Sequence, residues 1–128
     1  MKNKKWILIL NALIIMLLVC NKISAQNQSP MVRIAKLQID SAQLESYKAI
    51  LKEEIETSVR VEAGVLNLYA VADKKNPTSI TVFEIYLNQE AYLAHLQTPH
   101  FKKYKTETKE MVKSFELMET VPIVLGVK

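Results

Sequence analysis

The chain has 128 residues, of which 49% are hydrophobic and only two are glycine, and this composition is typical of one globular domain. The formal net charge of +4 comes from residues 1–25, which hold four of the 17 basic residues and none of the 13 acidic ones. The rest of the chain is neutral and therefore lacks the positive excess that nucleic-acid binding requires.

The first 25 residues have the layout of a secretory signal peptide. A basic start at residues 1–5 precedes an apolar run at residues 6–19, and the small residues Ser24 and Ala25 follow. The run is shorter than the roughly 20 residues that a membrane-spanning helix needs. We therefore expect cleavage after Ala25 and export to the periplasm or the medium, with a membrane anchor through residues 6–19 as the alternative.

Cys20, the only cysteine, ends this apolar run, so lipidation is a second way in which the N-terminus could hold the protein at a membrane. Val19 argues against lipidation, because lipoprotein signals usually carry a small residue before the cysteine. Once the signal is removed, the domain contains no disulfide and no thiol nucleophile.

Residues 26–30 are a polar lead-in, residues 31–124 are expected to form the domain, and residues 125–128 are a short tail. Apolar periodicity, capping residues and turn residues divide the domain into elements. These elements are a strand at residues 31–39, a helix at 41–60, strands at 65–72 and 80–87, a short helix at 89–97, a longer helix at 101–115 and a strand at 115–124. The order β-α-β-β-α-β predicts an α+β ferredoxin-like sandwich, in which a four-stranded antiparallel sheet carries its helices on one face.

The two strands of the central hairpin are apolar on both faces. In the first of them, strict alternation places Val65, Tyr69 and Val71 on one face and Leu66 and Leu68 on the other. A sheet that is covered on one face alone should instead alternate apolar and polar residues. Since two helices cover only one face, we expect a second copy of the chain to pack on the other, which gives a homodimer.

Four motifs follow one another at a characteristic spacing: Glu62-Ala-Gly-Val-Leu-Asn-Leu-Tyr69, Phe83-Glu-Ile-Tyr86, His95, and His100-Phe101-Lys-Lys-Tyr104. In this combination the chain resembles the antibiotic-biosynthesis-monooxygenase domain family, including its small quinol monooxygenases, over residues 31–123. The resemblance implies a dimeric α/β barrel of two facing sheets, with a pocket in each subunit between the sheet and its helices. It also implies oxidation of a small electron-rich aromatic substrate by O₂ without flavin, haem or metal, so no cofactor is expected.

A quinol becomes a strong electron donor once it is deprotonated, so such a site needs a base and a water-poor pocket. His95 is the first candidate for the base, because an ordinary histidine pKa suits proton abstraction near neutral pH. Its alternative role is to pack or cap the short helix. Glu84 lies mid-strand between apolar neighbours, where an unpaired carboxylate is costly. It is a candidate to orient His95 or to act as a reserve base, and its alternative role is a structural hydrogen bond.

Five further residues are candidates for binding the substrate. Tyr69 and Tyr86 lie on neighbouring strands, where each hydroxyl could meet a ring oxygen of the substrate or be satisfied within the core. Asn67 interrupts an apolar strand, so its amide could contact the substrate or could serve a bulge or an interface. His100 and Phe101 follow Pro99 at the start of a helix. The alternative for His100 is a capping or surface role, and the alternative for Phe101 is a position in the core.

Several other function classes lack support in the sequence. The chain has no phosphate-binding loop and no dinucleotide-binding fingerprint. Its two histidines are five residues apart across Pro99, which is not the i, i+4 spacing of a helical zinc pair, so we expect no metal site. Two alternatives to the oxidation of a quinol remain: a non-catalytic small-molecule-binding barrel, and an isomerase that uses the same base without O₂.

Overall fold

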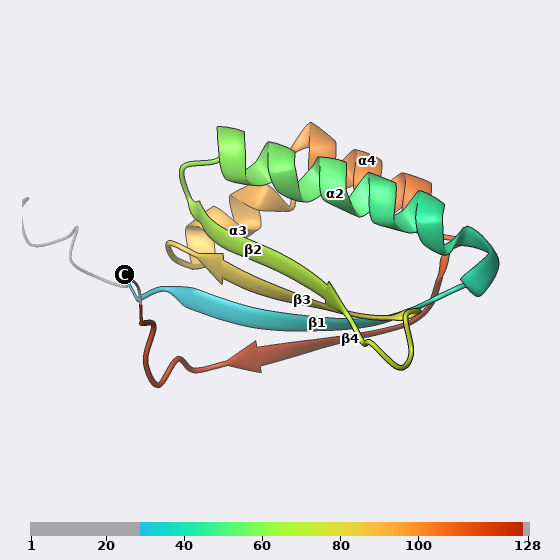
Figure 1. Ribbon diagram of the computed structural model, residues 1–128. Helices are drawn as coiled ribbons and strands as arrows, with labels where there is room; N and C mark the ends of the chain where they lie inside the picture. The colour runs from blue at the N-terminus through green and yellow to red at the C-terminus, as the bar shows by residue number, and fades with distance from the viewer. Residues whose placement is uncertain (1–28, 127–128) are drawn as a thin grey trace, which may run out of the picture.

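The computed structural model describes residues 29–126 (Figure 1). Its elements in chain order are β1 (Met31–Ile39), the 3-10 turn η2 (Ser41–Gln43), α2 (Leu44–Val61), β2 (Val65–Ala72), β3 (Ser79–Tyr86), α3 (Gln89–His95), α4 (Pro99–Thr108) and β4 (Val112–Thr120). The signal peptide expected at residues 1–25, with Cys20, lies outside the described residues. Within residues 29–126, no helix is both long enough and apolar enough to cross a bilayer.

The four strands form one antiparallel sheet in the order β2-β3-β1-β4. Helices α2, α3 and α4 all lie over the same face of this sheet, and the opposite face is bare in Figure 1. The predicted α+β ferredoxin-like fold is therefore confirmed. The short turn between β2 and β3 also confirms the predicted hairpin, whose strands pair from Val65 with Tyr86 to Ala72 with Ile80.

The main core lies between α2 and the covered face of the sheet. Alternate residues of β1 point toward the helices, and they meet α2 and β3 in one buried cluster: Ala35, Leu37, Ile39, Tyr47, Leu51, Ile80 and Val82. Each large side chain buried in this way stabilises the fold by about 1.5–3 kcal/mol. A second, smaller cluster of Val65, Leu68 and Tyr86 packs under α3.

The alternation expected along β2 is wrong at its start. The register of β2 against β3 shifts between Val65 and Asn67, so one extra residue is inserted there. As a result Val65 and Leu68 share the covered face and are both buried, whereas Leu66 is half exposed. Tyr69, which strict alternation placed on the same face as Val65, instead lies on the bare face and is 60% exposed.

The second long helix is shorter than predicted, because α4 ends at Thr108 and not at Phe115. The hydroxyl of Thr108 donates to the carbonyl of Tyr104, and a turn follows in which the amide of Met111 donates to the carbonyl of Thr108. From Val112 the chain pairs with β1 and places Phe115 opposite Leu37. A helix that continued to Phe115 would leave this edge of β1 without hydrogen-bond partners, so strand pairing outweighs the helical spacing.

Candidate active site

A cavity of about 480 Å³ lies between the covered face of the sheet and the helices. Apolar and aromatic side chains form most of its wall, among them Ala35, Leu37, Leu68, Val82, Phe101 and Phe115. Its polar lining includes Glu54 from α2, Glu84 and Tyr86 from β3, and His95 from α3. A few polar groups in a mostly apolar cavity are typical of a small-molecule site.

The turn between α3 and α4 fixes the position of both histidines. Asn88 caps α3, since its side-chain oxygen accepts from the amide of Ala91, and the helix ends at His95. The Thr98 hydroxyl donates to the carbonyl of His95 at 2.7 Å and accepts from the amide of Phe101 at 3.3 Å. This single side chain therefore closes one helix and caps the next, which begins with Pro99 and His100.

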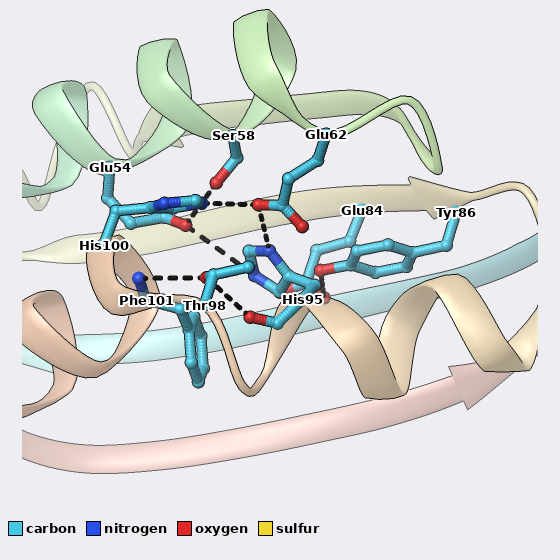
Figure 2. A network of polar contacts seen from close by, with 9 residues as sticks. All are labelled: Glu54, Ser58, Glu62, Glu84, Tyr86, His95, Thr98, His100 and Phe101. Atoms are coloured by element: carbon cyan, nitrogen blue, oxygen red, sulfur yellow. Dashed lines mark hydrogen bonds and ion pairs between the residues drawn. The ribbon is translucent and has the colours of Figure 1, made fainter.

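His95 is 3% exposed and lies at the centre of a polar network (Figure 2). Its Nδ1 is 3.0 Å from Oε1 of Glu62, and its Nε2 is 3.6 Å from Oε1 of Glu54, which is beyond hydrogen-bonding distance. The Phe101 ring packs against the imidazole with centroids 4.7 Å apart, and the Tyr86 ring lies 5.4 Å away. The imidazole is thus held by one carboxylate and two aromatic rings.

Glu62 joins the two histidines, because its Oε1 contacts Nδ1 of His95 and also Nε2 of His100. Burial acts to raise the pKa of Glu62, but the hydrogen bonds from His100 and His95 outweigh it and hold the pKa below the ordinary value. An ionised carboxylate only accepts hydrogen bonds, so His95 donates through Nδ1. In the neutral imidazole this leaves the lone pair on Nε2.

Glu54 and Ser58 lie one turn apart on α2, and both are buried. The Ser58 hydroxyl donates to Oε1 of Glu54 at 2.8 Å. Burial raises the pKa of Glu54, although the Ser58 hydrogen bond and the nearby histidines oppose this. The carboxyl group of Glu54 is therefore held in a fixed orientation beside His95.

Glu84 and Tyr86 alternate along β3 and so share its covered face. The Tyr86 hydroxyl donates to Oε2 of Glu84 at 3.0 Å. Burial raises the pKa of Glu84, and burial together with the neighbouring Glu84 raises the pKa of Tyr86 well above its ordinary value. Tyr86 therefore stays neutral, and with its proton directed at Glu84 its oxygen can accept a hydrogen bond from a ligand.

The cavity brings together four of the residues singled out from the sequence: Glu84, Tyr86, His95 and Phe101. His100 reaches the same network through Glu62 without lining the cavity. Asn67 and Tyr69 do not line it, because the register shift in β2 gives the position on the covered face to Leu68.

The hydrogen-bond partners of His95 and Glu84 differ from those expected. The residue that holds His95 is Glu62, and the carboxyl of Glu84 instead accepts from Tyr86. Glu54, Ser58 and Glu62 are site residues that were not predicted from the sequence. A signal was present, since Glu54 and Ser58 continue the buried face of α2 that includes Leu51, and a carboxylate on such a face is unusual.

The structure also brings together side chains that could hold a metal ion. Within residues 29–126, one ligand atom each from Glu54, His95 and His100 lies within 4.8 Å of the other two. The i, i+4 spacing applies to two histidines on a single helix. The α3–α4 turn instead presents His95 from the end of one helix and His100 from the start of the next.

A model of the family described as antibiotic biosynthesis monooxygenase matches residues 30–107. The chain belongs to the antibiotic biosynthesis monooxygenase family. Among solved structures, a candidate monooxygenase of this family from Bacteroides thetaiotaomicron is 51% identical, with a TM-score of 0.76, over 78% of this chain and 95% of that one. A candidate monooxygenase from Lactobacillus acidophilus is 33% identical, with a TM-score of 0.69, over 70% of this chain and 43% of that one.

A more distant family protein, from Nitrosomonas europaea, is 18% identical with a TM-score of 0.70 over 77% of this chain and 93% of that one, and this likeness concerns the fold alone. None of the curated proteins matches the chain significantly. The family indicated by the motifs and the ferredoxin-like fold predicted from the order of the elements are thus confirmed. Membership of the antibiotic biosynthesis monooxygenase family and its monooxygenase neighbours together support a monooxygenase.

Proposed function

We propose that the protein oxidises a small electron-rich phenol or quinol with O₂, without an organic or metal cofactor, and that His95 is the base. The observation that carries the proposal is the pair formed by Glu62 and His95 at the wall of a mostly apolar cavity. Glu62 accepts from Nδ1, so the lone pair on Nε2 is available for a proton. The buried carboxylate also stabilises the imidazolium that forms when the proton arrives.

The reaction begins when a hydroxyl of the bound quinol gives its proton to Nε2 of His95. The resulting anion is a stronger reductant than the neutral quinol and transfers an electron to O₂ in the cavity. This transfer gives a semiquinone radical and superoxide. Their recombination forms a carbon–oxygen bond, and loss of water from the resulting hydroperoxide yields a hydroxyquinone. One quinol and one O₂ thus give one hydroxyquinone and one water. The substrate supplies all four electrons, so no external reductant is required.

Tyr86 and Glu84 suit a role in positioning the substrate. The Tyr86 hydroxyl directs its proton to Glu84, so its oxygen is an acceptor for the second hydroxyl of a quinol. A substrate with two hydroxyl donors on one ring can then contact Tyr86 and His95 together. The mostly apolar wall contributes by excluding water from the developing anion.

The bare face of the sheet supports the homodimer that we propose for the working enzyme. Tyr69 and Val71 on β2 are 60% and 62% exposed, and Leu66 is half exposed beside them. A sheet face that leaves large apolar side chains in water is typical of an interface. We therefore assign Tyr69 to the contact between subunits.

The proposal is tested by measuring O₂ consumption by the purified protein, freed of metal and flavin, with each of a panel of substituted hydroquinones as the substrate. We expect uptake above autoxidation, and its reduction by about 10²- to 10⁴-fold in His95→Ala, the usual contribution of a general base. Gln97→Ala is the matched control, because Gln97 is exposed near His95 and does not line the cavity. Uptake that is unchanged in His95→Ala would exclude His95 as the base. Turnover of the panel without O₂ would favour an isomerase, and binding without turnover a small-molecule-binding protein.

A further inference from the structure

We propose that Glu54, His95 and His100 form a binding site for a divalent first-row transition metal ion such as Zn²⁺ or Co²⁺. The site lies where the last turns of α2 face the α3–α4 turn (Figure 2). Imidazole nitrogens with a carboxylate oxygen suit ions of this class, whereas Mg²⁺ and Ca²⁺ prefer oxygen ligands alone. Both histidines of the chain are in this cluster.

The distances are close to those of a coordinated ion. Bonds of about 2.0–2.2 Å from Zn²⁺ to nitrogen or oxygen place two ligand atoms about 3.4 Å apart in a tetrahedral site. Nε2 of His95 and Oε1 of Glu54 are 3.6 Å apart, which already matches this separation. The ligand atoms of the three residues lie within 4.8 Å of one another, so the widest pair must close by at most about 1.4 Å. Rotation of the His100 side chain, which exchanges its contact with Glu62 for the ion, can supply a shift of this size.

The residues around the cluster hold these ligands in position. Glu62 accepts from Nδ1 of His95, which fixes the ring orientation and directs Nε2 toward Glu54. Ser58 donates to Glu54 and so fixes the carboxylate. A metal-binding histidine usually donates its other ring N–H to a carboxylate, a backbone carbonyl or water, and Glu62 supplies such an acceptor here.

Charge and access from solvent also favour a bound cation. The carboxyl groups of Glu54 and Glu62 both lie next to His95 in a buried environment, and a divalent ion would compensate two negative charges there. The His100 side chain is 18% exposed, compared with 7% for Glu54 and 3% for His95, so the ion would enter from its side.

Metal binding here and oxidation with His95 as the base exclude each other, because both need Nε2 of His95. A bound ion is therefore expected to inhibit O₂ uptake. The metal site does not depend on the proposed oxidation, since binding can be measured without any substrate.

The test is to titrate the purified protein with two metal ions. Visible absorption monitors the binding of Co²⁺, and calorimetry measures the binding of Zn²⁺. Cys20 is replaced by serine so that no thiol can bind the ion. We expect saturation at about one equivalent per chain, with the absorption of a low-coordinate Co²⁺ ion. Glu54→Gln and His100→Ala should abolish this absorption, and Glu62→Gln should weaken binding by about 10- to 100-fold, as is usual for a group that orients a ligand.

Glu56→Gln is the matched control, because Glu56 is exposed on the same helix and should leave the affinity unchanged. Circular dichroism of each variant shows that it is folded, and Glu54→Gln preserves the side-chain volume. Failure of the Cys20→Ser protein to bind would overturn the metal site, and so would equal affinity in the His100→Ala variant. Metal binding without O₂ uptake would support the metal site and refute the proposed oxidation. O₂ uptake without metal binding would support the oxidation and refute the metal site.

Discussion

Gly64 allows α3 to pack against the end of α2, and replacing it with alanine tests how tightly this contact positions His95. A Cβ atom at residue 64 would lie 2.5 Å from Cβ of Ala91 and 3.4 Å from its Cα. Real Cβ contacts are not this short, so α3 must move away. Overpacking of this kind costs about 1–3 kcal/mol. The expected fall in melting temperature is about 4–8 °C for each kcal/mol in a domain of this size.

A second substitution separates the steric clash from other effects of Gly64→Ala. Ala91→Gly removes the clashing atom and alone should cost about 1 kcal/mol in helix propensity. In the double variant the clash is absent, so the free energy of unfolding should fall by about 1 kcal/mol in total, well short of the sum of the two single effects. Ala94→Gly on the exposed side of α3 is the control, and its effect should add to that of Gly64→Ala.

Urea denaturation of these variants gives the free energies, and O₂ uptake reports whether α3 still presents His95. The steric explanation is refuted if Gly64→Ala changes stability by less than about 0.5 kcal/mol or if the two substitutions are additive.

Three further substitutions test other parts of the structure. Glu62→Gln should lower kcat for O₂ uptake at least about tenfold with little change in KM, because it weakens the group that orients His95, and steady-state kinetics measures both constants. Burial raises the pKa of Glu84 in the folded protein, so the stability that Glu84 contributes is present at low pH and is lost as pH rises through the folded pKa. Glu84→Gln should therefore be more stable than the wild type at neutral pH in urea titrations, with the difference vanishing as pH falls toward the ordinary glutamate pKa of about 4.3. If the proposed homodimer forms through the bare face, Tyr69→Lys should convert it to monomers in sedimentation velocity, because each subunit would bury an unpaired charge at the interface.

The elements whose type depends on local patterns were predicted well. β1 and β2 have the bounds that the sequence indicated, because alternating or continuous apolar residues lie between clear turns. The end of α4 was predicted wrongly, since Phe115 continues a helical spacing from Phe101 and only its pairing with Leu37 on a distant strand makes it part of β4. The bulge near the start of β2 was also missed, because a bulge depends on the register of two strands and has no marker in either strand alone.

The same distinction applies to the candidate site. His95 could be found because it is a titratable residue near the end of a predicted helix, and Glu84 because it is a titratable residue within an apolar strand. Their partners could not be assigned, because Glu62 lies 33 residues from His95 and its side chain reaches the imidazole only when the turn after α2 packs on α3. Glu54 was detectable as a carboxylate on a buried helical face, but nothing local to α2 indicates that the α3–α4 turn lies opposite.

Both uses proposed for Nε2 of His95 follow from the way in which Glu62 holds the ring. A carboxylate that accepts from Nδ1 fixes the tautomer and the ring orientation, so the lone pair of Nε2 is available to a proton or to a metal ion. The relative affinities and concentrations of the two ligands decide which use prevails; a quinol would reach Nε2 through the mostly apolar cavity and an ion from the side of His100. Substitution of His100 should therefore abolish metal binding while leaving the cavity wall intact. Substitution of His95 should abolish both metal binding and O₂ uptake. A protein in which His100→Ala raises O₂ uptake in the presence of Zn²⁺ would show that the two ligands compete for one nitrogen.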